Sequence, residues 1–124
     1  MSKIDHIRRI MLACFLMLAA ALPTVAFAGD GTALEVVISR PKAGSTLEQL
    51  LAADKKMEQD FASKQKGFIS REVAVSKDGE VIVIVHWATL ADAEAAGAIF
   101  MSDPAAKPRL DISDASLFKH YVVQ

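Results

Sequence analysis

The sequence of 124 residues has one cysteine, one tryptophan, one tyrosine and only 4 prolines. Cys14 lies in the apolar N-terminal stretch, so the rest of the chain has no disulfide, no thiolate nucleophile and no cysteine-based metal site. There is also no glycine-rich phosphate loop, no Gly-x-Ser-x-Gly turn and no His-Glu-x-x-His sequence. These absences give no support to a nucleotide-dependent enzyme, a serine hydrolase or a zinc peptidase.

The N-terminus has the pattern of an export signal. Basic residues precede an apolar stretch over 10–22, which is shorter than the ~20 residues that a bilayer span needs. Ala26-Phe27-Ala28 then supplies the small-x-small pattern that signal peptidase requires. We therefore expect residues 1–28 to be a signal peptide, cut after Ala28, and the product to be periplasmic or secreted with no membrane attachment. A retained membrane anchor is the alternative.

The remaining residues, 29–124, are enough for one compact domain and too few for two. They hold 11 basic and 14 acidic side chains, a net charge of −3. An acidic domain of this kind is poorly suited to bind nucleic acid or an anionic membrane surface.

The apolar periodicity predicts the order β-α-β-β-α-β. Strands are expected at 33–39, 68–76, 81–87 and 117–123, and helices from Ser45 to about Gln65 and from Thr89 to Asp103, with a short helical turn around 109–112. Ser45 with Glu48, and Thr89 with Asp92, have the spacing of helix N-caps. This order is typical of the ferredoxin-like α+β fold, an antiparallel sheet in the order 4-1-3-2 with two helices on one face. Strict alternation in the second strand places Arg71 on one side and Phe68 on the other.

The strand Val81–Trp87 (VIVIVHW) is apolar on both faces. Two helices cover only one face of such a sheet. Burying each Val or Ile side chain contributes roughly 1.5–3 kcal/mol, so a face left in water would forgo several kcal/mol. We therefore expect the bare face to pack against a second copy of the chain in a symmetric homodimer.

Three short stretches resemble the antibiotic biosynthesis monooxygenase-like (ABM) domains of the dimeric α+β barrel superfamily, in its exported members. The step His86-Trp87-Ala88-Thr89-Leu90-Ala91-Asp92-Ala93 is similar to their Trp-x-(Ser/Thr)-x-x-x-Ala pattern between the third strand and the second helix, and the other stretches are Phe100–Pro104 and His120-Tyr121. The resemblance implies a family of mixed function, including cofactor-independent oxygenases of polyketide-like aromatics and haem-degrading enzymes. The latter carry a Ser-Asp-x-Phe-x-x-x-His pattern, whereas Ser102-Asp103 is followed here by Pro-Ala-Ala-Lys. No haem or other cofactor is therefore expected.

His86 and His120, the two histidines after the leader, are the candidate catalytic residues. Each suits a general base near neutral pH, or one ligand of a metal or haem, but the interpretation that the pattern favours is a histidine hydrogen-bonded in or beside the core. Two histidines without a carboxylate motif fall short of a metal signature, so no metal site is predicted. They share a pocket only if the faces of their strands agree.

The candidate substrate-binding residues are Trp87, Tyr121, Arg71 and Phe100. The first two form either the aromatic wall of a pocket or packing in the core or dimer interface. Arg71, like Glu35, is a charge on an apolar strand side, and we expect either an inter-subunit ion pair or a role in orienting substrate. The charged run 54–60 reads as a solvated helix face, with Asp54 at the edge of the apolar stripe.

Two functions remain open. By the resemblance, the chain is a cofactor-independent monooxygenase of a small aromatic or quinone-like substrate, in which oxygen attacks a carbanion after His86 or His120 removes a proton. The substrate is expected in a pocket between helices and sheet. The alternative is a non-catalytic periplasmic protein, either a small-ligand binder or a stress-related dimer, that uses the same pocket.

Overall fold

The computed structural model describes residues 31–124. Its strands are β1 (Ala33–Pro41), β2 (Phe68–Val75), β3 (Val81–Trp87) and β4 (Ser113–Val122), and its helices are α2 (Leu47–Asp60), the 3-10 helix η1 (Ala62–Lys64), α3 (Leu90–Phe100) and α4 (Lys107–Ile112). The predicted order is confirmed, and α4 occupies the expected helical turn. The predicted signal peptide lies outside the described residues, and among those described no helix has the length and apolarity to span a membrane.

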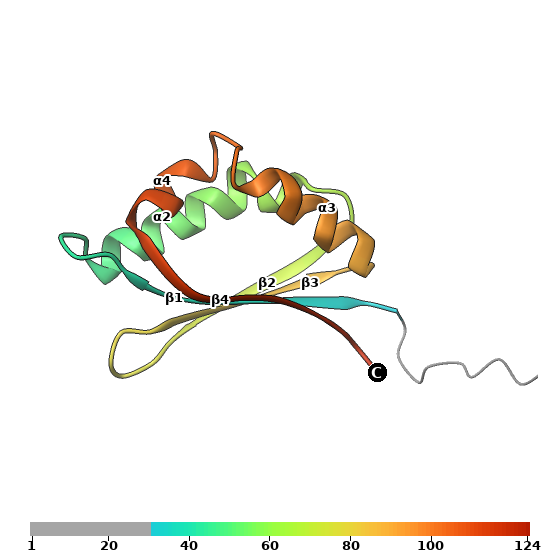
Figure 1. Ribbon diagram of the computed structural model, residues 1–124, viewed down its shortest axis with the longest axis horizontal. Helices are drawn as coiled ribbons and strands as arrows, with labels where there is room; N and C mark the ends of the chain where they lie inside the picture. The colour runs from blue at the N-terminus through green and yellow to red at the C-terminus, as the bar shows by residue number, and fades with distance from the viewer. Residues whose placement is uncertain (1–30) are drawn as a thin grey trace, which may run out of the picture.

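The four strands form one antiparallel sheet in the order β2-β3-β1-β4, as predicted. Figure 1 shows α2, α3 and α4 together on one side of this sheet, which we call the covered face, while no helix from residues 31–124 lies on the opposite bare face. The fold is therefore ferredoxin-like α+β, with a third helix that the sequence patterns predicted only as a turn.

The core lies between the covered face and the helices. Val81, Val83, Val85 and Trp87 alternate along β3 and are all buried there. The intervening Ile82, Ile84 and His86 point to the bare face and are only half-buried in a single chain. The prediction that this strand is apolar on both faces is confirmed.

Helix α2 begins one residue later than predicted. Its N-cap is Thr46, whose hydroxyl accepts a hydrogen bond from the Gln49 N–H, while the Gln49 side chain accepts one from the Thr46 N–H. This reciprocal capping box takes the place of the expected pair Ser45 and Glu48, because Thr-x-x-Gln has the same spacing and the same donors and acceptors. The helix also ends earlier, at Asp60.

An irregularity in β2 changes which side chains face the core. Phe68 lies opposite Trp87 while Ser70 lies opposite His86, so Ile69 is an extra residue in the strand. Phe68 therefore shares the covered face with Arg71, contrary to the alternation expected from the sequence, and its ring meets the Trp87 ring edge-on with centroids 6.0 Å apart. A second register shift, between Ile38 and Ser39, lets β4 begin at Ser113 rather than at position 117.

Candidate active site

A cavity of about 110 Å³ lies between the covered face and the helices. Most of its walls are apolar side chains from the sheet, α2 and α3, including Trp87, Phe100 and Phe118. Its polar lining comes from Glu35, Arg71, Arg109, Trp87 and Ser113. An apolar cavity with a few converging polar groups is typical of a small-molecule site.

Two polar residues that line the cavity, Glu35 and Arg71, belong to one row across the sheet together with His120, which lies outside the lining. His120 on β4 lies opposite Glu35 on β1, Glu35 lies opposite Val85 on β3, and Val85 lies opposite Arg71 on β2. Residues opposite one another in antiparallel strands project to the same face. Because strands are about 5 Å apart, the backbones of Glu35 and Arg71 are separated by about 10 Å. An acid–base pair and a guanidinium thus stand on either side of an apolar floor.

Glu35 and His120 form the first polar group. Oε2 of Glu35 lies 2.9 Å from Nε2 of His120, and their side chains are only 12% and 16% exposed. Burial raises the pKa of the Glu35 carboxyl above its usual 4.5, although the hydrogen bond and charge of His120 and the charges of Arg71 and Arg109 act in the opposite direction. A buried carboxyl with a raised pKa beside an imidazole is suited to proton transfer.

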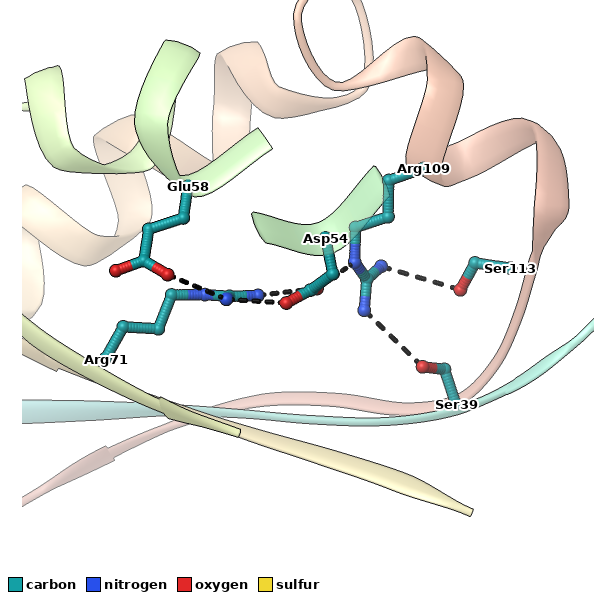
Figure 2. Close-up of polar contacts among 6 residues, drawn as sticks. All are labelled: Ser39, Asp54, Glu58, Arg71, Arg109 and Ser113. Carbon is teal, nitrogen blue, oxygen red and sulfur yellow. Dashed lines mark hydrogen bonds and ion pairs between the residues drawn. The ribbon is translucent and has the colours of Figure 1, made fainter. Parts of the chain in front are cut away.

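Asp54 is the centre of the second polar group, which Figure 2 shows. Its carboxylate accepts two hydrogen bonds of 2.6 Å from Nη1 and Nη2 of Arg71, and a third of 2.6 Å from Nε of Arg109. These three side chains come from α2, β2 and α4, so the network joins two helices to the sheet. Asp54 is 2% exposed, which corrects the expectation that it sits at the edge of the helix stripe.

The arginines determine the ionisation of Asp54. Burial is the largest single effect and opposes ionisation, but the hydrogen bonds and charges of Arg71 and Arg109 together outweigh it, so the pKa of Asp54 lies below its usual 3.8. The sequence stretch 54–60 is therefore solvated only in part. Its Lys56–Asp60 pair is on the surface as expected, with Nζ and Oδ2 2.7 Å apart.

The two candidate histidines lie on opposite faces of the sheet. His86 is opposite Leu34 and Ser70 on the bare face, where its Nε2 lies 3.8 Å from Oε1 of Glu72. His120 is on the covered face, beside the cavity. Of the two histidines, His120 is the one connected to the cavity, through its contact with the lining residue Glu35.

The candidate binding residues divide in the same way. Trp87, Arg71 and Phe100 line the cavity, whereas Tyr121 lies opposite Leu34 on the bare face. Trp87 and Tyr121 therefore do not form one aromatic wall in a single chain. The charges of Arg71 and Glu35 find partners within the chain, in place of the expected inter-subunit ion pair.

Sequence reasoning missed Arg109 and the pairing of Glu35 with His120. Arg109 lies in a segment without periodicity, and no local pattern separates it from an exposed arginine. A weak signal existed for Asp54, since it interrupts an otherwise apolar stripe. Pairing across the sheet joins residues that are far apart in sequence, so it becomes visible only with the register.

Trp87 holds the remaining polar atom of interest. Its side chain is buried, and its indole N–H finds no acceptor among residues 31–124. A buried donor without a partner is rare, and the residue that carries it is one of those that line the cavity.

No protein-family model matches the sequence, and no curated protein matches it. Solved structures with the same fold include a point mutant of SnoaB, a cofactor-independent oxygenase from Streptomyces nogalater, at 14% identity and a TM-score of 0.60, covering 76% of this chain and 92% of that one. A putative antibiotic biosynthesis monooxygenase from Nitrosomonas europaea is 13% identical with a TM-score of 0.56, covering 76% and 89%. A dimeric ferredoxin-like protein of unknown function from Bacteroides fragilis is 12% identical with a TM-score of 0.52, covering 75% and 97%. The resemblance to ABM domains is thus confirmed at the level of the fold.

Proposed function

We propose that this chain is a cofactor-independent monooxygenase of a small aromatic or quinone-like substrate, which binds in the cavity between sheet and helices. The observation that carries the proposal is the buried Glu35–His120 pair beside a mostly apolar cavity. Such a site suits a reaction in which a base removes a proton from an activated carbon and water is kept away. The fold shared with an oxygenase supports the same reading by analogy.

In this mechanism Glu35 faces the substrate, because its side chain lines the cavity. His120 lies behind Glu35, outside the cavity lining, and shares the proton through the 2.9 Å contact. This assigns to the pair the role that the sequence suggested for a histidine alone. The charge left on the substrate is an enolate or phenolate oxygen, for which the unpaired Trp87 N–H is a donor on the same cavity wall.

The oxidation balances with dioxygen as the only co-reactant. The carbanion gives its electrons to dioxygen, a carbon–oxygen bond forms, and the resulting peroxide takes a proton from the Glu35–His120 pair. Loss of a second proton from the same carbon breaks the oxygen–oxygen bond and releases water. A CH₂ group, which a phenol has at an unsubstituted ortho or para carbon in its keto tautomer, and O₂ thus become a carbonyl group and H₂O. A phenol is in this way converted to a quinone, and no external reductant is needed.

The cavity size limits the substrate. An engineered cavity of ~150 Å³ holds one benzene ring, and the cavity here has about 110 Å³. We therefore expect a single ring, admitted by a small movement of Phe118, which lines the cavity and is half exposed. This is smaller than the polyketide-like aromatics that the family resemblance implies.

Oxygen uptake with hydroquinones and other single-ring phenols tests the proposal. We expect Glu35→Gln and His120→Ala to lower kcat by about 100-fold or more, as for other general bases, while His86→Ala on the bare face retains the activity. Equal activity in all three variants would remove the Glu35–His120 pair from the mechanism. No oxygen uptake, together with an intact ligand found by native mass spectrometry, would instead favour the non-catalytic binder.

We also propose that the chain forms a homodimer through the bare face. Half-buried apolar side chains on β1 and β3 support it, and the similar structure from Bacteroides fragilis is described as dimeric. We also propose export to the periplasm after cleavage at Ala28. The support for it is the N-terminal sequence pattern alone.

A further inference from the structure

The cavity borders a surplus of buried positive charge. Arg71 and Arg109 have side chains that are 1% and 4% exposed, and they share a single buried carboxylate, Asp54. Glu58 lies 3.4 Å from Arg71, but its side chain is 35% exposed, and among residues 31–124 it is the Asp54 carboxylate that hydrogen-bonds Arg109. A buried cation is costly unless an anion and hydrogen bonds compensate it. Arg71 has Asp54 and Glu58 as direct partners, whereas Arg109 has Asp54 in direct contact and Glu35 only at longer range.

Arg109 holds the less satisfied charge. Its Nε donates to Asp54 at 2.6 Å, but Nη1 reaches Ser113 only at 3.5 Å and Nη2 reaches Ser39 only at 3.4 Å. Both contacts exceed the usual 2.7–3.2 Å range and end at neutral hydroxyls. Figure 2 shows these two long contacts leaving the outer side of the guanidinium. Arg109 and Ser113 both line the cavity.

We propose that the outer edge of Arg109 is a binding subsite for a carboxylate, so that the ligand of this cavity is a single-ring aromatic acid. The two outer nitrogens of a guanidinium match the two oxygens of a carboxylate, which a neutral hydroxyl on each nitrogen does not. This inference rests on the proposed function for the location of the substrate, and it adds the chemical class of that substrate.

The other carboxylates near the cavity have no hydrogen bond to the outer nitrogens of Arg109. Asp54 already accepts from both arginines, and the Glu35 carboxyl, whose pKa burial raises and the charge of Arg109 partly lowers, is hydrogen-bonded to His120. The aromatic ring of an acid held at Arg109 would occupy the apolar part of the cavity. Trp87 and Val85 line that part, and the unpaired Trp87 N–H adds a donor for a second substituent on the ring.

Calorimetric titration of the full protein without oxygen tests the subsite, with 4-hydroxybenzoate as the acid and 4-hydroxybenzamide as its neutral counterpart of equal shape. Charge-assisted hydrogen bonds contribute about 1.5–3 kcal/mol, so we expect the acid to bind on the order of tenfold tighter or more. Equal affinity for the two compounds, or no binding of either, would overturn the inference without any variant being made.

Two arginine variants locate the preference. Arg109→Met keeps the length of the side chain and is expected to abolish the preference for the acid. Arg40→Met removes a surface arginine that pairs with Asp78, and the preference should persist. If Arg109→Met does not fold, Arg109→Lys keeps the charge without the fork and should reduce the preference; an unchanged preference in a folded Arg109 variant contradicts the subsite.

The two proposals fail separately. An acid preference without oxygen uptake from any phenol would refute the oxygenase and retain the subsite. Oxygen uptake with neutral phenols, together with equal binding of acid and amide, would refute the subsite and retain the oxygenase.

Discussion

Nε2 of His120 lies 2.9 Å from Oε2 of Glu35 although 85 positions separate the two residues in the sequence. Burial raises the pKa of the Glu35 carboxyl, so folding favours its neutral form relative to the unfolded chain. The stability linked to that neutral form is fully present below the ordinary pKa of 4.5, and it is lost as the pH rises through the raised pKa of the folded protein.

Glu35→Gln should remove this loss, because the amide does not ionise. We expect the unfolding free energy of the variant, relative to that of the wild type, to increase as the pH rises from about 4 to about 8. Urea unfolding at a series of pH values measures it, and Glu94→Gln on the exposed side of α3 is the control. If the unfolding free energies of Glu35→Gln and the wild type changed with pH in parallel, burial would not raise the pKa of the Glu35 carboxyl.

Asp54→Asn should destabilise the protein by about 3–5 kcal/mol, since it leaves two buried guanidiniums without their shared carboxylate. Chemical denaturation checks this, with Asp60→Asn as control because Asp60 pairs with Lys56 on the surface, where ion pairs contribute little. A loss no greater than that of the control would show that the network does not hold α2 and α4 to the sheet.

The same carboxylate predicts an acid limit of stability. The pKa of Asp54 is lowered in the folded protein, so its contribution is present above the ordinary value of 3.8 and is lost as the pH falls through the lower folded pKa. Asp54→Asn should therefore flatten the decline of stability below about pH 4. An equally steep decline in the variant would assign acid unfolding to other groups.

Local signals were enough to predict most of the fold. Thr89 caps α3 with Asp92 as its spacing indicates, and Gly79 takes a positive φ of 84° in the Asp-Gly turn between β2 and β3. The side chains of Val81–Trp87 alternate between the two faces of the sheet, as the sequence pattern predicts. These features depend on residues a few positions apart, which a single sequence displays directly.

The site depended on features that local patterns do not carry. The extra residue Ile69 in β2 reverses the facing of Phe68 relative to Arg71, and nothing in FISREVAV marks it. Whether His86 and His120 shared a face depended on the register of two strands against β1. Arg109 meets Asp54 from 55 positions away. These positions in the site therefore depend on tertiary contacts between residues that are far apart in the sequence.

Gly97→Ala should stabilise the folded protein and weaken ligand binding in the cavity. An added Cβ at this position in α3 would lie 3.7 Å from the His120 and Phe118 rings, which is ordinary contact, and alanine favours a helix over glycine by about 1 kcal/mol. Gly97 lines the cavity, so the methyl group also narrows it. We expect a higher Tm together with weaker binding of the aromatic acid. Unchanged binding would place the ligand away from α3.

Ile84→Glu tests the bare face. Ile84 lies opposite Val36 on β1 and Glu72 on β2, and in one chain it is only half-buried. If a second copy covers this face, the substitution places an unpaired carboxylate in an apolar interface at a cost of about 3–5 kcal/mol, which corresponds to a dimer dissociation constant raised by about 100-fold or more.

Sedimentation velocity over a range of concentrations measures this shift, and Ala98→Glu on the exposed side of α3 is the matched control. The variant should sediment as a folded monomer with an unchanged circular dichroism spectrum, because the core on the covered face does not contact position 84. A wild-type chain that remains monomeric at micromolar concentration would contradict the dimer. In that case the half-buried isoleucines and valines of β1 and β3 would lie against water, and part of the expected hydrophobic stabilisation would be missing from the measured unfolding free energy.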